Sequence, residues 1–462
     1  MTGDDEMQQK NLNIPKTAII IVSYNNKEMM QSCIESIRAN NDPDTYQIIV
    51  VDNASEDGVA EWLAKQTDII LIANNENKGF PYACNQGIAE ADKDADIFLL
   101  NNDTIVTENA LHWLRMGLYS DENIGAVGSV SNNVVNYQQV SERFATLEEW
   151  MDFAKHNNVE MEYPYEKKGW LVGFAMLIKR VAVNTILEVE GKENDDIPEV
   201  LDCRFSPGNY EDNDLSIRLL KNGYKLLLCK NSFIFHYGGK SFRKNNEKYI
   251  SLLLHNQKKL EDKYGIDFIP YSVVESALVD MIKPDRPDFT LLEIGCKLGA
   301  TLARIESRYP QSRLCGVEKN YKLAELAKQV AHVQCEDILK VDTLNSEYEG
   351  KYDYILLDHV LRADGNEKDM LKKAKMCAKL GGILLVSVEN CQCIRHSDKG
   401  FTLDGIVELF NGCGLALEEF NYRPLKCDNH EKKLLEEKMK DIDASMRPLY
   451  EAECFIFAAR KV

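Results

Sequence analysis

Four apolar runs near the start of the chain, each ending in a cluster of small polar side chains, constrain the fold more than any other feature of the sequence. They cover residues 17–23, 47–51, 69–73 and 96–100. Unbroken β-branched and aliphatic runs are typical of strands that are buried on both faces. Segments with the apolar spacing of helices lie between the runs. Repeated strand–loop–helix units predict an α/β fold with a parallel sheet covered by helices.

The polar loops after these runs predict a site. Residues 24–26, 52–58, 74–80 and 101–104 are rich in Asn, Asp, Ser and Gly. The carboxyl ends of parallel strands meet at one edge of a sheet, where open α/β folds bind ligands. Asp103 is a hard oxygen donor that could hold a divalent cation against a diphosphate. For this loop alone, an ordinary Asn/Asp turn is the alternative.

Other features narrow the function classes. A chain of 462 residues favours two domains. The net charge of -19 argues against nucleic acid as a main partner. There is no GxGxxG or GxxxxGK motif in the first half, so neither a dinucleotide nor a P-loop nucleotide site is expected there. No apolar run is long enough to span a bilayer, and the polar first residues do not look like a signal peptide. The 13 cysteines lack metal-type spacing, which favours reduced thiols and a cytoplasmic protein.

The motifs VSYNN, VVDNASEDG, ENKGFPYACNQGI and LLNNDT occur in this order. GWLVGFAMLIKR, NYEDNDLSIRLLKNGYKL and FHYGGKS follow them. With these motifs, the segment from Ile14 to Lys244 resembles the family-two glycosyltransferases of the GT-A fold, especially the bacterial branch that adds rhamnose or galactofuranose-type sugars. The resemblance implies inverting transfer of a sugar from a UDP- or dTDP-sugar to a hydroxyl acceptor, such as a surface glycan or a surface protein like flagellin.

The resemblance also implies roles for individual residues. Asp103 and His236 are the implied ligands of a Mn²⁺ or Mg²⁺ ion that bridges the diphosphate. Asp212 is the implied base, with Glu211 as the close alternative, and a neighbouring carboxylate can raise the pKa of such a base. The implied nucleotide-sugar contacts are Tyr24, Asp52, Asn75, Gly79, Asn85 and Asn102.

Plainer interpretations of the same residues remain open. The acidic run could simply begin a helix over residues 214–222, since carboxylates favour helix N-termini. His236 could be an interior histidine. Between these motifs, residues 132–168 are irregular and should encode acceptor specificity. The aromatic side chains in and just after this stretch could stack on a sugar or could pack ordinarily; they are Trp150, Tyr163, Tyr165 and Trp170.

The second half begins after a predicted helix over residues 245–265. We therefore expect domains at 1–265 and 266–462. From Thr290 a new strand–loop–helix pattern carries EIGCKLGATL, LCGVEKN, CEDILKVD and DYILLDHVL, which resemble the motifs of class I S-adenosylmethionine-dependent methyltransferases. This implies a second, Rossmann-like α/β domain with S-adenosylmethionine as cofactor. The implied contacts are Glu293, Gly295, Gly299, Glu318, Asp337, Ile338 and Asp358. Lys297 stands where the family usually has glycine.

Three hypotheses follow. The first is a bifunctional enzyme that transfers a sugar and methylates the sugar or its acceptor. The second keeps the glycosyltransferase but makes the C-terminal domain a non-catalytic binding or docking module, with Lys297 as the sign of lost catalysis. The third is a carbohydrate-binding protein without activity. Retention of the four residues Asp52, Asp103, Asp212 and His236 counts against the third.

Overall fold

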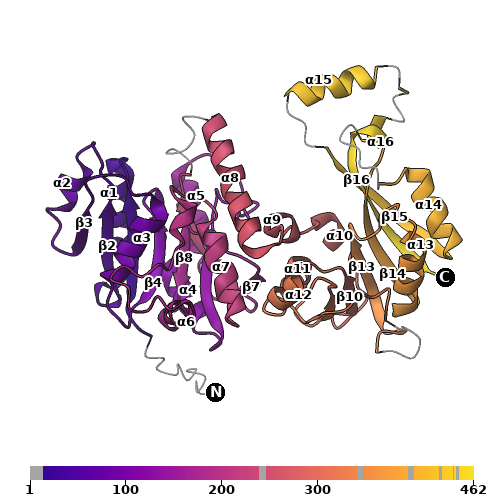
Figure 1. Cartoon of the computed structure of the whole chain (residues 1–462), viewed down its shortest axis with the longest axis horizontal. Coiled ribbons are helices and arrows are strands. Elements are labelled where there is room, and N and C mark those ends of the chain that lie inside the picture. The colour runs from indigo at the N-terminus through magenta and orange to yellow at the C-terminus, as the bar shows by residue number, and fades with distance from the viewer. Residues whose placement is uncertain are drawn as a thin grey trace, which may run out of the picture. The chain divides into compact units, whose positions relative to one another are not determined.

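The chain divides into two compact units, Met1–Gly265 and Ile266–Val462, here named the N-terminal and the C-terminal unit (Figure 1). The computed structural model describes residues 14–238, 246–341, 347–393, 400–425, 429–440, 442–443 and 447–462. The first 13 residues and positions 239–241 of the FHYGGKS motif lie outside the described residues. Within the described ranges, no helix is long and apolar enough to cross a membrane.

The N-terminal unit is built on a nine-stranded mixed sheet. Its strands are β1 (Thr17–Ser23), β2 (Tyr46–Asp52), β3 (Ile69–Ala73), β4 (Asp96–Asn101), β5 (Thr104–Val106), β6 (Ile124–Val130), β7 (Tyr165–Lys168), β8 (Ala175–Ile178) and β9 (Lys225–His236). Its α-helices are α1 (Lys27–Asn40), α2 (Val59–Leu63), α3 (Phe80–Ala89), α4 (Ala110–Leu118), α5 (Leu147–Asn157), α6 (Arg180–Glu190), α7 (Glu211–Lys221) and α8 (Asn246–Tyr264). Two short 3₁₀ turns are η1 (Pro43–Thr45) and η2 (Cys203–Phe205).

Strand direction decides which chain segments reach the ligand edge of this sheet. The order is β3-β2-β1-β4-β8-β6-β9-β5, with β7 paired to β9. The strands from β3 to β4 are parallel, as the sequence pattern predicts. Beyond them, in the part of the sheet that the repeated pattern does not cover, β8 runs antiparallel to both β4 and β6. Strand β9 is parallel to β6, so β4, β6 and β9 all end at the same edge.

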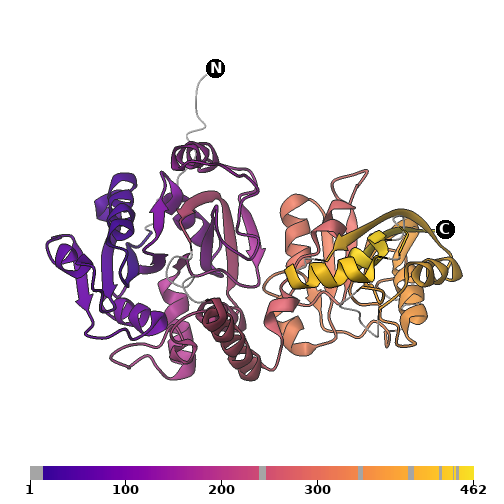
Figure 2. The ribbon, with the colours of Figure 1, turned by 90° about the horizontal axis from the view of Figure 1, so that it is seen from above.

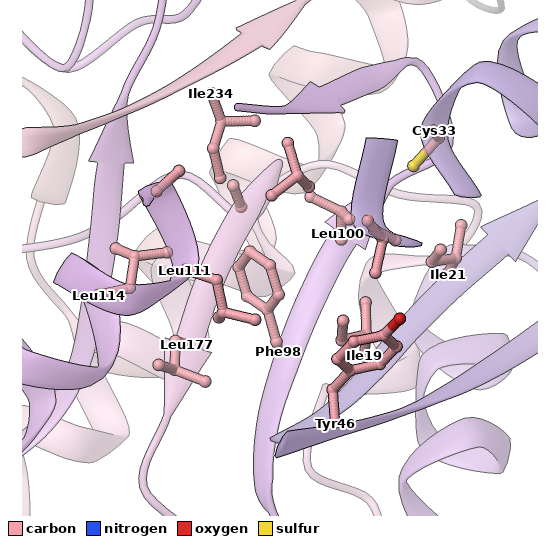
Figure 3. Packing of buried hydrophobic residues seen from close by; sticks show 14 of the residues in the cluster. Ile19, Ile21, Cys33, Tyr46, Phe98, Leu100, Leu111, Leu114, Leu177 and Ile234 are labelled. Carbon is pink, nitrogen blue, oxygen red and sulfur yellow. The ribbon is translucent and has the colours of Figure 1, made fainter. Parts of the chain in front are cut away.

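A core of apolar side chains holds β4 in place. Figure 3 shows Phe98 and Leu100 of β4 among Leu111 and Leu114 of α4 and Leu177 of β8. All of these side chains are at most 2% exposed. Protein cores are packed as densely as organic crystals, so the end of β4 is a rigid support for the loop that carries Asp103.

The C-terminal unit has a seven-stranded sheet in the order β12-β11-β10-β13-β14-β16-β15. Its strands are β10 (Thr290–Ile294), β11 (Arg313–Val317), β12 (Val333–Gln334), β13 (Tyr352–Asp358), β14 (Ala378–Glu389), β15 (Leu415–Pro424) and β16 (Ala452–Lys461). Its helices are α9 (Phe268–Tyr271), α10 (Ser276–Asp280), α11 (Ala300–Arg308), α12 (Tyr321–Ala327), α13 (Glu367–Cys377), α14 (Leu403–Gly412), α15 (Asn429–Lys438) and α16 (Arg447–Glu451). Figure 2 shows both units from above.

The topology of this second sheet is that of a Rossmann-like class I methyltransferase fold. Strands β12, β11, β10, β13 and β14 are parallel, and the chain order reverses between β10 and β13. Strand β16 is inserted antiparallel between β14 and β15. A reversal of strand order creates a crevice at the carboxyl edge of such a sheet.

Some predicted boundaries differ from the structure. Helix α7 begins at Glu211 rather than at residue 214, so the acidic pair lies in its first turn. Strand β2 extends one residue beyond the predicted run 47–51 at each end, and β4 ends at Asn101 rather than at residue 100.

Candidate functional site

Asp103 and His236 form a close pair at the ligand edge of the N-terminal unit. The short strand β5 pairs antiparallel with β9, with Thr104 opposite His236, and this register brings the two side chains together. His236 Nε2 lies 3.2 Å from Asp103 Oδ1, and the side chains are only 12% and 15% exposed. Neighbouring ligands of an octahedral cation with bonds of about 2.1 Å lie about 3 Å apart, which fits this spacing.

The tautomer of His236 strengthens the case for a cation. Its Nδ1 lies 2.8 Å from the backbone oxygen of Asn133. A carbonyl oxygen only accepts hydrogen bonds, so Nδ1 carries the proton and a neutral ring turns its Nε2 lone pair toward Asp103. Two acceptors at this distance repel each other unless a cation lies between them or the ring takes a second proton. The donors present therefore fit a divalent metal ion.

Asp212 reaches the same neighbourhood through Gly173 and Phe174. The backbone N–H of Gly173 donates to Asp212 Oδ2 at 3.0 Å. The ring of Phe174 stacks on His236 with a centroid separation of 5.1 Å. The Phe174 carbonyl accepts the Asn101 N–H at 2.8 Å. Adjacent residues of one segment thus contact the carboxylate, the imidazole and the loop of Asp103.

The acidic pair at the start of α7 has an unusual environment. Glu211 is 7% exposed, and one of its carboxylate oxygens has no hydrogen-bond partner among the described residues. Burial, followed by the charge of Asp212, raises the pKa of Glu211 to about 8. Burial also raises the pKa of Asp212. Asn209 and Tyr210, just before the pair, both have left-handed backbone (φ 75° and 76°), a strained conformation that clusters at functional sites.

Side chains of helix α8 bind the first two turns of α7. Asp214 is fully buried and accepts hydrogen bonds from Arg218 at 2.9 Å, from the Tyr264 hydroxyl at 2.7 Å and from Lys263. Lys263 also pairs with Asp202 at 2.8 Å. These bonds fix the helix that carries Asp212, so the sequence expectation that the acidic run starts a helix is also correct.

The loops after β1 and β2 are tied to each other. Asp52 is 2% exposed, and its oxygens accept the backbone N–H of Ser55 at 3.0 Å and the Ser55 hydroxyl at 2.5 Å. Ser55 in turn accepts the Asn25 N–H at 2.7 Å. Tyr24, by contrast, is 46% exposed beside this loop. Contacts of Tyr24 and Asp52 with a nucleotide stay predictions.

One of the three expected sugar-side residues is exposed, and the other two are buried. Asn75 is exposed. Gly79 is left-handed (φ 85°), and a Cβ there would lie 2.9 Å from Ser206 Oγ, so glycine is required. Asn85 is 1% exposed, and its amide pairs with both the N–H and the carbonyl of Leu201, at 2.8 and 2.7 Å. The expectation that Asn85 lines the sugar is therefore wrong: it anchors the segment before η2.

Asn132 and Asn133 hold His236 beside Asp103, and the sequence motifs do not single them out. Asn132 bonds the backbone of His236 on both sides, accepting its N–H at 2.8 Å and donating to its carbonyl at 3.1 Å. The Asn133 carbonyl sets the tautomer of the ring. Both follow the end of β6, so the rule that polar residues after a strand mark the ligand edge could have found them. Asn102 is half-buried next to Asp103, and its contact with the donor remains a prediction.

The aromatic residues proposed for the acceptor divide into two kinds. Trp150 is 6% exposed and stacks on Phe233 at 5.5 Å between ring centroids, so it packs in a core. Trp170 is also buried, at 9% exposed. Tyr163, at 45% exposed, can still contact a ligand, whereas Tyr165 is half-buried on β7.

The C-terminal unit gathers acidic groups at the carboxyl edge of its own sheet. Glu318, after β11, accepts the N–H groups of Lys297 and Asn320 at 2.9 and 2.8 Å. Lys297 is left-handed (φ 54°), so the position does need the backbone that glycine adopts most easily. The Lys297 ammonium lies 2.6 Å from Asp358, which is 4% exposed. This ion pair spans the ends of β10 and β13.

The remaining predicted cofactor residues lie on the same edge or just below it. Glu293 is 2% exposed, and burial raises its pKa well above the usual value. Gly295 is left-handed (φ 72°), and a Cβ there would lie 2.8 Å from Val360. Gly299 is left-handed (φ 74°) and caps α11. Asp337 is half-buried and Ile338 is buried, both beyond the end of β12.

Comparison with known proteins agrees with the fold of the N-terminal unit. Residues 18–186 match the family model of glycosyl transferase family 2. An uncharacterized glycosyltransferase, YfnE of Bacillus subtilis, is 36% identical over 86 residues, which is 18% of this chain and 22% of that protein. A poly-beta-1,6-N-acetyl-D-glucosamine synthase of Staphylococcus aureus is 30% identical over 111 residues, 23% of this chain and 26% of that protein. The chain thus spans about a quarter of the length of these curated relatives.

Solved structures similar to parts of the chain include a glycosyltransferase and a methyltransferase. A mannosyltransferase of Pyrobaculum calidifontis in complex with GDP-Man and Mn²⁺ is 15% identical, with a TM-score of 0.38, over 68% of this chain and 74% of that one. A methyltransferase from Bacillus halodurans, itself described as putative, is 12% identical, with a TM-score of 0.30, over 40% of this chain and 98% of that one.

The family match and the sheet define the class. Residues 18–186 of the N-terminal unit match the glycosyl transferase family 2 model on a GT-A-like mixed α/β sheet, and the C-terminal unit has a Rossmann-like sheet of the methyltransferase type.

Proposed function

We propose that the N-terminal unit is a cation-dependent inverting glycosyltransferase, which moves a sugar from a nucleotide-diphosphate sugar to a hydroxyl acceptor. The pairing of Asp103 with His236 Nε2 at 3.2 Å is the observation that carries this proposal. A third group, Asp212, lies one segment away through Gly173 and Phe174.

Asp103 and His236 would hold the cation. A bound Mn²⁺ or Mg²⁺ supplies positive charge for the diphosphate as it leaves. Asn132 and Asn133 orient the imidazole, and β5 fixes the carboxylate, so the chain has its donors in place before any ligand binds. Such preorganisation spares the reaction the free energy of arranging these groups.

Asp212 would act as the base. The acceptor oxygen attacks the anomeric carbon, the bond from that carbon to the diphosphate breaks, and the hydroxyl proton passes to the Asp212 carboxylate. Gly173 holds the carboxylate by its N–H. Glu211 would modulate this base through its charge, because it titrates near neutral pH beside it.

The donor and acceptor are assigned only by class. Tyr24, Asn75 and Asn102 are accessible or half-buried at the strand ends and would contact a UDP- or dTDP-sugar, with Asp52 shaping the loop beside them. A relative is named as a synthase of a poly-N-acetylglucosamine, which supports a glycan acceptor here. A surface protein such as flagellin is the second acceptor class. The proposed compartment is the cytoplasm, where nucleotide sugars are made.

For the C-terminal unit we propose S-adenosylmethionine-dependent methylation of the sugar or its acceptor. Glu318 lies at the end of β11, where it could accept the ribose hydroxyls, and the left-handed Gly295 and Gly299 form the turn between β10 and α11 where the family's cofactor would bind. The alternative is a non-catalytic docking domain, and the ion pair between Lys297 and Asp358 favours it, because the lysine side chain occupies the edge of the crevice.

One set of measurements separates these proposals. Release of the nucleotide diphosphate from a panel of nucleotide sugars, with and without Mn²⁺, should show turnover of at least one donor that depends on the cation. Failure of the whole panel to turn over or to bind would overturn the glycosyltransferase proposal. Calorimetry with S-adenosylmethionine should show binding, and its absence would leave only the docking version of the C-terminal unit.

A further inference from the structure

Three side chains of the kinds that bind metals meet in the C-terminal unit, and only His359 belongs to a motif singled out in the sequence, DYILLDHVL. Glu275 precedes α10, His359 follows β13, and Cys454 lies in β16. One donor atom from each lies within 4.8 Å of the other two. Cys454 is paired with Glu389 at the end of β14, so the cluster lies at the carboxyl edge of the sheet.

The three donors are shielded from solvent. Cys454 is fully buried, and burial raises the pKa of its thiol to about 12. Glu275 is 7% exposed, and burial raises the pKa of its carboxyl group. His359 Nδ1 is buried and has no hydrogen-bond partner among the described residues. A buried polar atom without a partner costs about 1–3 kcal/mol, so its retention calls for a ligand or another explanation.

Ordinary packing explains part of the cluster but not all of it. The Arg423 guanidinium contacts one oxygen of Glu275 and lies 3.1 Å from Glu453, which accounts for the buried carboxylate. A buried thiol needs no partner. Neither accounts for His359, whose backbone is held in the left-handed region (φ 55°) and whose Nδ1 stays unpaired. The backbone N–H of Ala277 also donates to the Glu275 carboxylate.

We propose that Glu275, His359 and Cys454 form a binding site for a zinc-class divalent cation. Thiolate and imidazole donors favour Zn²⁺ and Co²⁺ over Mg²⁺ and Mn²⁺. Tetrahedral bonds of about 2.0–2.3 Å place ligand atoms roughly 3.3–3.7 Å apart, so donors within 4.8 Å need to close by about 1 Å. On binding, the cation displaces the thiol proton of Cys454, which passes to solvent.

The donor set also indicates what kind of site this is. Structural zinc sites use four protein ligands, whereas sites with three leave one position open for water or a substrate atom. The open position would face the edge where Asp358 pairs with Lys297, since His359 adjoins Asp358 in the chain, with Nε2 3.9 Å from Asp358 Oδ1. The cation would therefore lie beside the crevice of the C-terminal unit, whether or not that crevice binds S-adenosylmethionine.

Cobalt provides a direct test on the full-length protein. Stripped protein titrated with Co²⁺ should develop thiolate-to-cobalt charge-transfer absorption that saturates at one equivalent, and Zn²⁺ should abolish the band by displacement. The band should disappear in Cys454→Ser and persist in Cys335→Ser, a control at an exposed cysteine. Absence of the band, or its survival in Cys454→Ser, would overturn the proposal.

Two further variants guard against misfolding at the buried cysteine. His359→Asn suits the left-handed backbone, since asparagine adopts it readily, and Glu275→Gln keeps the size of the side chain. Each should weaken Co²⁺ binding at least tenfold while leaving the circular dichroism spectrum unchanged. Asp103→Ala should leave the thiolate band intact, because that residue belongs to the N-terminal unit. Unchanged Co²⁺ affinity in both ligand variants would refute the assignment.

Discussion

Asp103 and His236 depend on each other across a long stretch of chain, since only the pairing of β5 with β9 brings them together. We expect Asp103→Asn and His236→Ala each to lower cation-dependent donor turnover by at least about 100-fold, a loss of about 2.7 kcal/mol of transition-state stabilisation. The double variant should be little worse than either single variant, because both remove the same site. Steady-state rates measured across a Mn²⁺ titration check this.

A matched control for Asp103, which follows β4, is an aspartate before the start of β4. Asp94 precedes β4 and is exposed, so Asp94→Asn should turn over the donor like the parent protein. If Asp103→Asn kept parental activity at low Mn²⁺, its assignment as a ligand would be wrong.

Glu211 and Asp212 predict a pH dependence. Asp212 must be ionised to accept a proton, and its raised pKa means that activity falls as pH decreases through that value. The charge of Asp212 helps to raise the pKa of Glu211 to about 8, so Glu211 is neutral while Asp212 ionises at lower pH. Glu211→Gln should therefore leave the acidic limb of the rate profile in place and remove any change of rate near pH 8. Asp212→Asn should lose nearly all transfer at every pH. A displaced acidic limb in Glu211→Gln would contradict this order of ionisation.

The sequence predicts the role of a residue only where polar side chains directly follow a strand or begin a helix. Asp103 and the acidic pair follow from motifs at the ends of strands and the start of a helix. Asn85 was misassigned because its partner, the backbone of Leu201, is invisible until the chain folds. Asn132 and Asn133 were within reach, because they follow β6 in the way that the predicted loops follow β1 to β4.

At the scale of elements, the ion pairs between α8 and α7 can be tested by substitution. Lys263→Met removes the cation between Asp202 and the fully buried Asp214 and leaves those charges less compensated. We expect a loss of about 3 kcal/mol in the free energy of unfolding of the N-terminal unit. Lys258→Met on the same helix breaks only an exposed pair with Asp262 and should leave the free energy of unfolding essentially unchanged.

Tryptophan fluorescence during urea denaturation isolates the relevant unit. All four tryptophans lie at positions 62, 113, 150 and 170, in the N-terminal unit. Equal denaturation midpoints for the two lysine variants would show that the ion pairs of Lys263 with Asp202 and Asp214 do not stabilise the N-terminal unit.

Element boundaries followed well from apolar patterning, whereas strand direction did not. Strands β1 and β3 have the predicted limits, because unbroken apolar runs flanked by polar loops mark them. The reversed strand β8 could not be predicted, since a buried run reads alike in either direction. Register also lies beyond the pattern, and it is the register of β5 on β9 that forms the metal pair.

For the molecule as a whole, two units predict two separate responses to ligands. A nucleotide sugar with Mn²⁺ at 100 times its Kd should raise the free energy of unfolding of the N-terminal unit by about 2.7 kcal/mol. The transition temperature seen by tryptophan fluorescence should rise accordingly. S-adenosylmethionine should raise a transition seen by calorimetry but silent in fluorescence. In Lys297→Gly, which removes the ammonium next to Asp358, the response to S-adenosylmethionine should increase.

The outcome for Lys297→Gly also distinguishes the two versions of the C-terminal unit. A stronger response would mean that the lysine limits cofactor binding at an otherwise competent crevice. A lack of response in both proteins, with the fluorescence transition still raised by the donor, would leave a transferase joined to a docking domain.

The reversed strand β8 has a consequence for how such a protein could diversify. Because β8 runs antiparallel to its neighbours, its first residues, which follow Gly173 and Phe174, lie beside the end of β4. Apart from His236 and the two asparagines that orient it, the groups proposed to hold the donor come from positions before 105. Residues 134–168, which make up most of the stretch expected to encode acceptor specificity, include none of them. Mutations in the later stretch could therefore redirect the sugar to new recipients without disturbing the grip on the nucleotide.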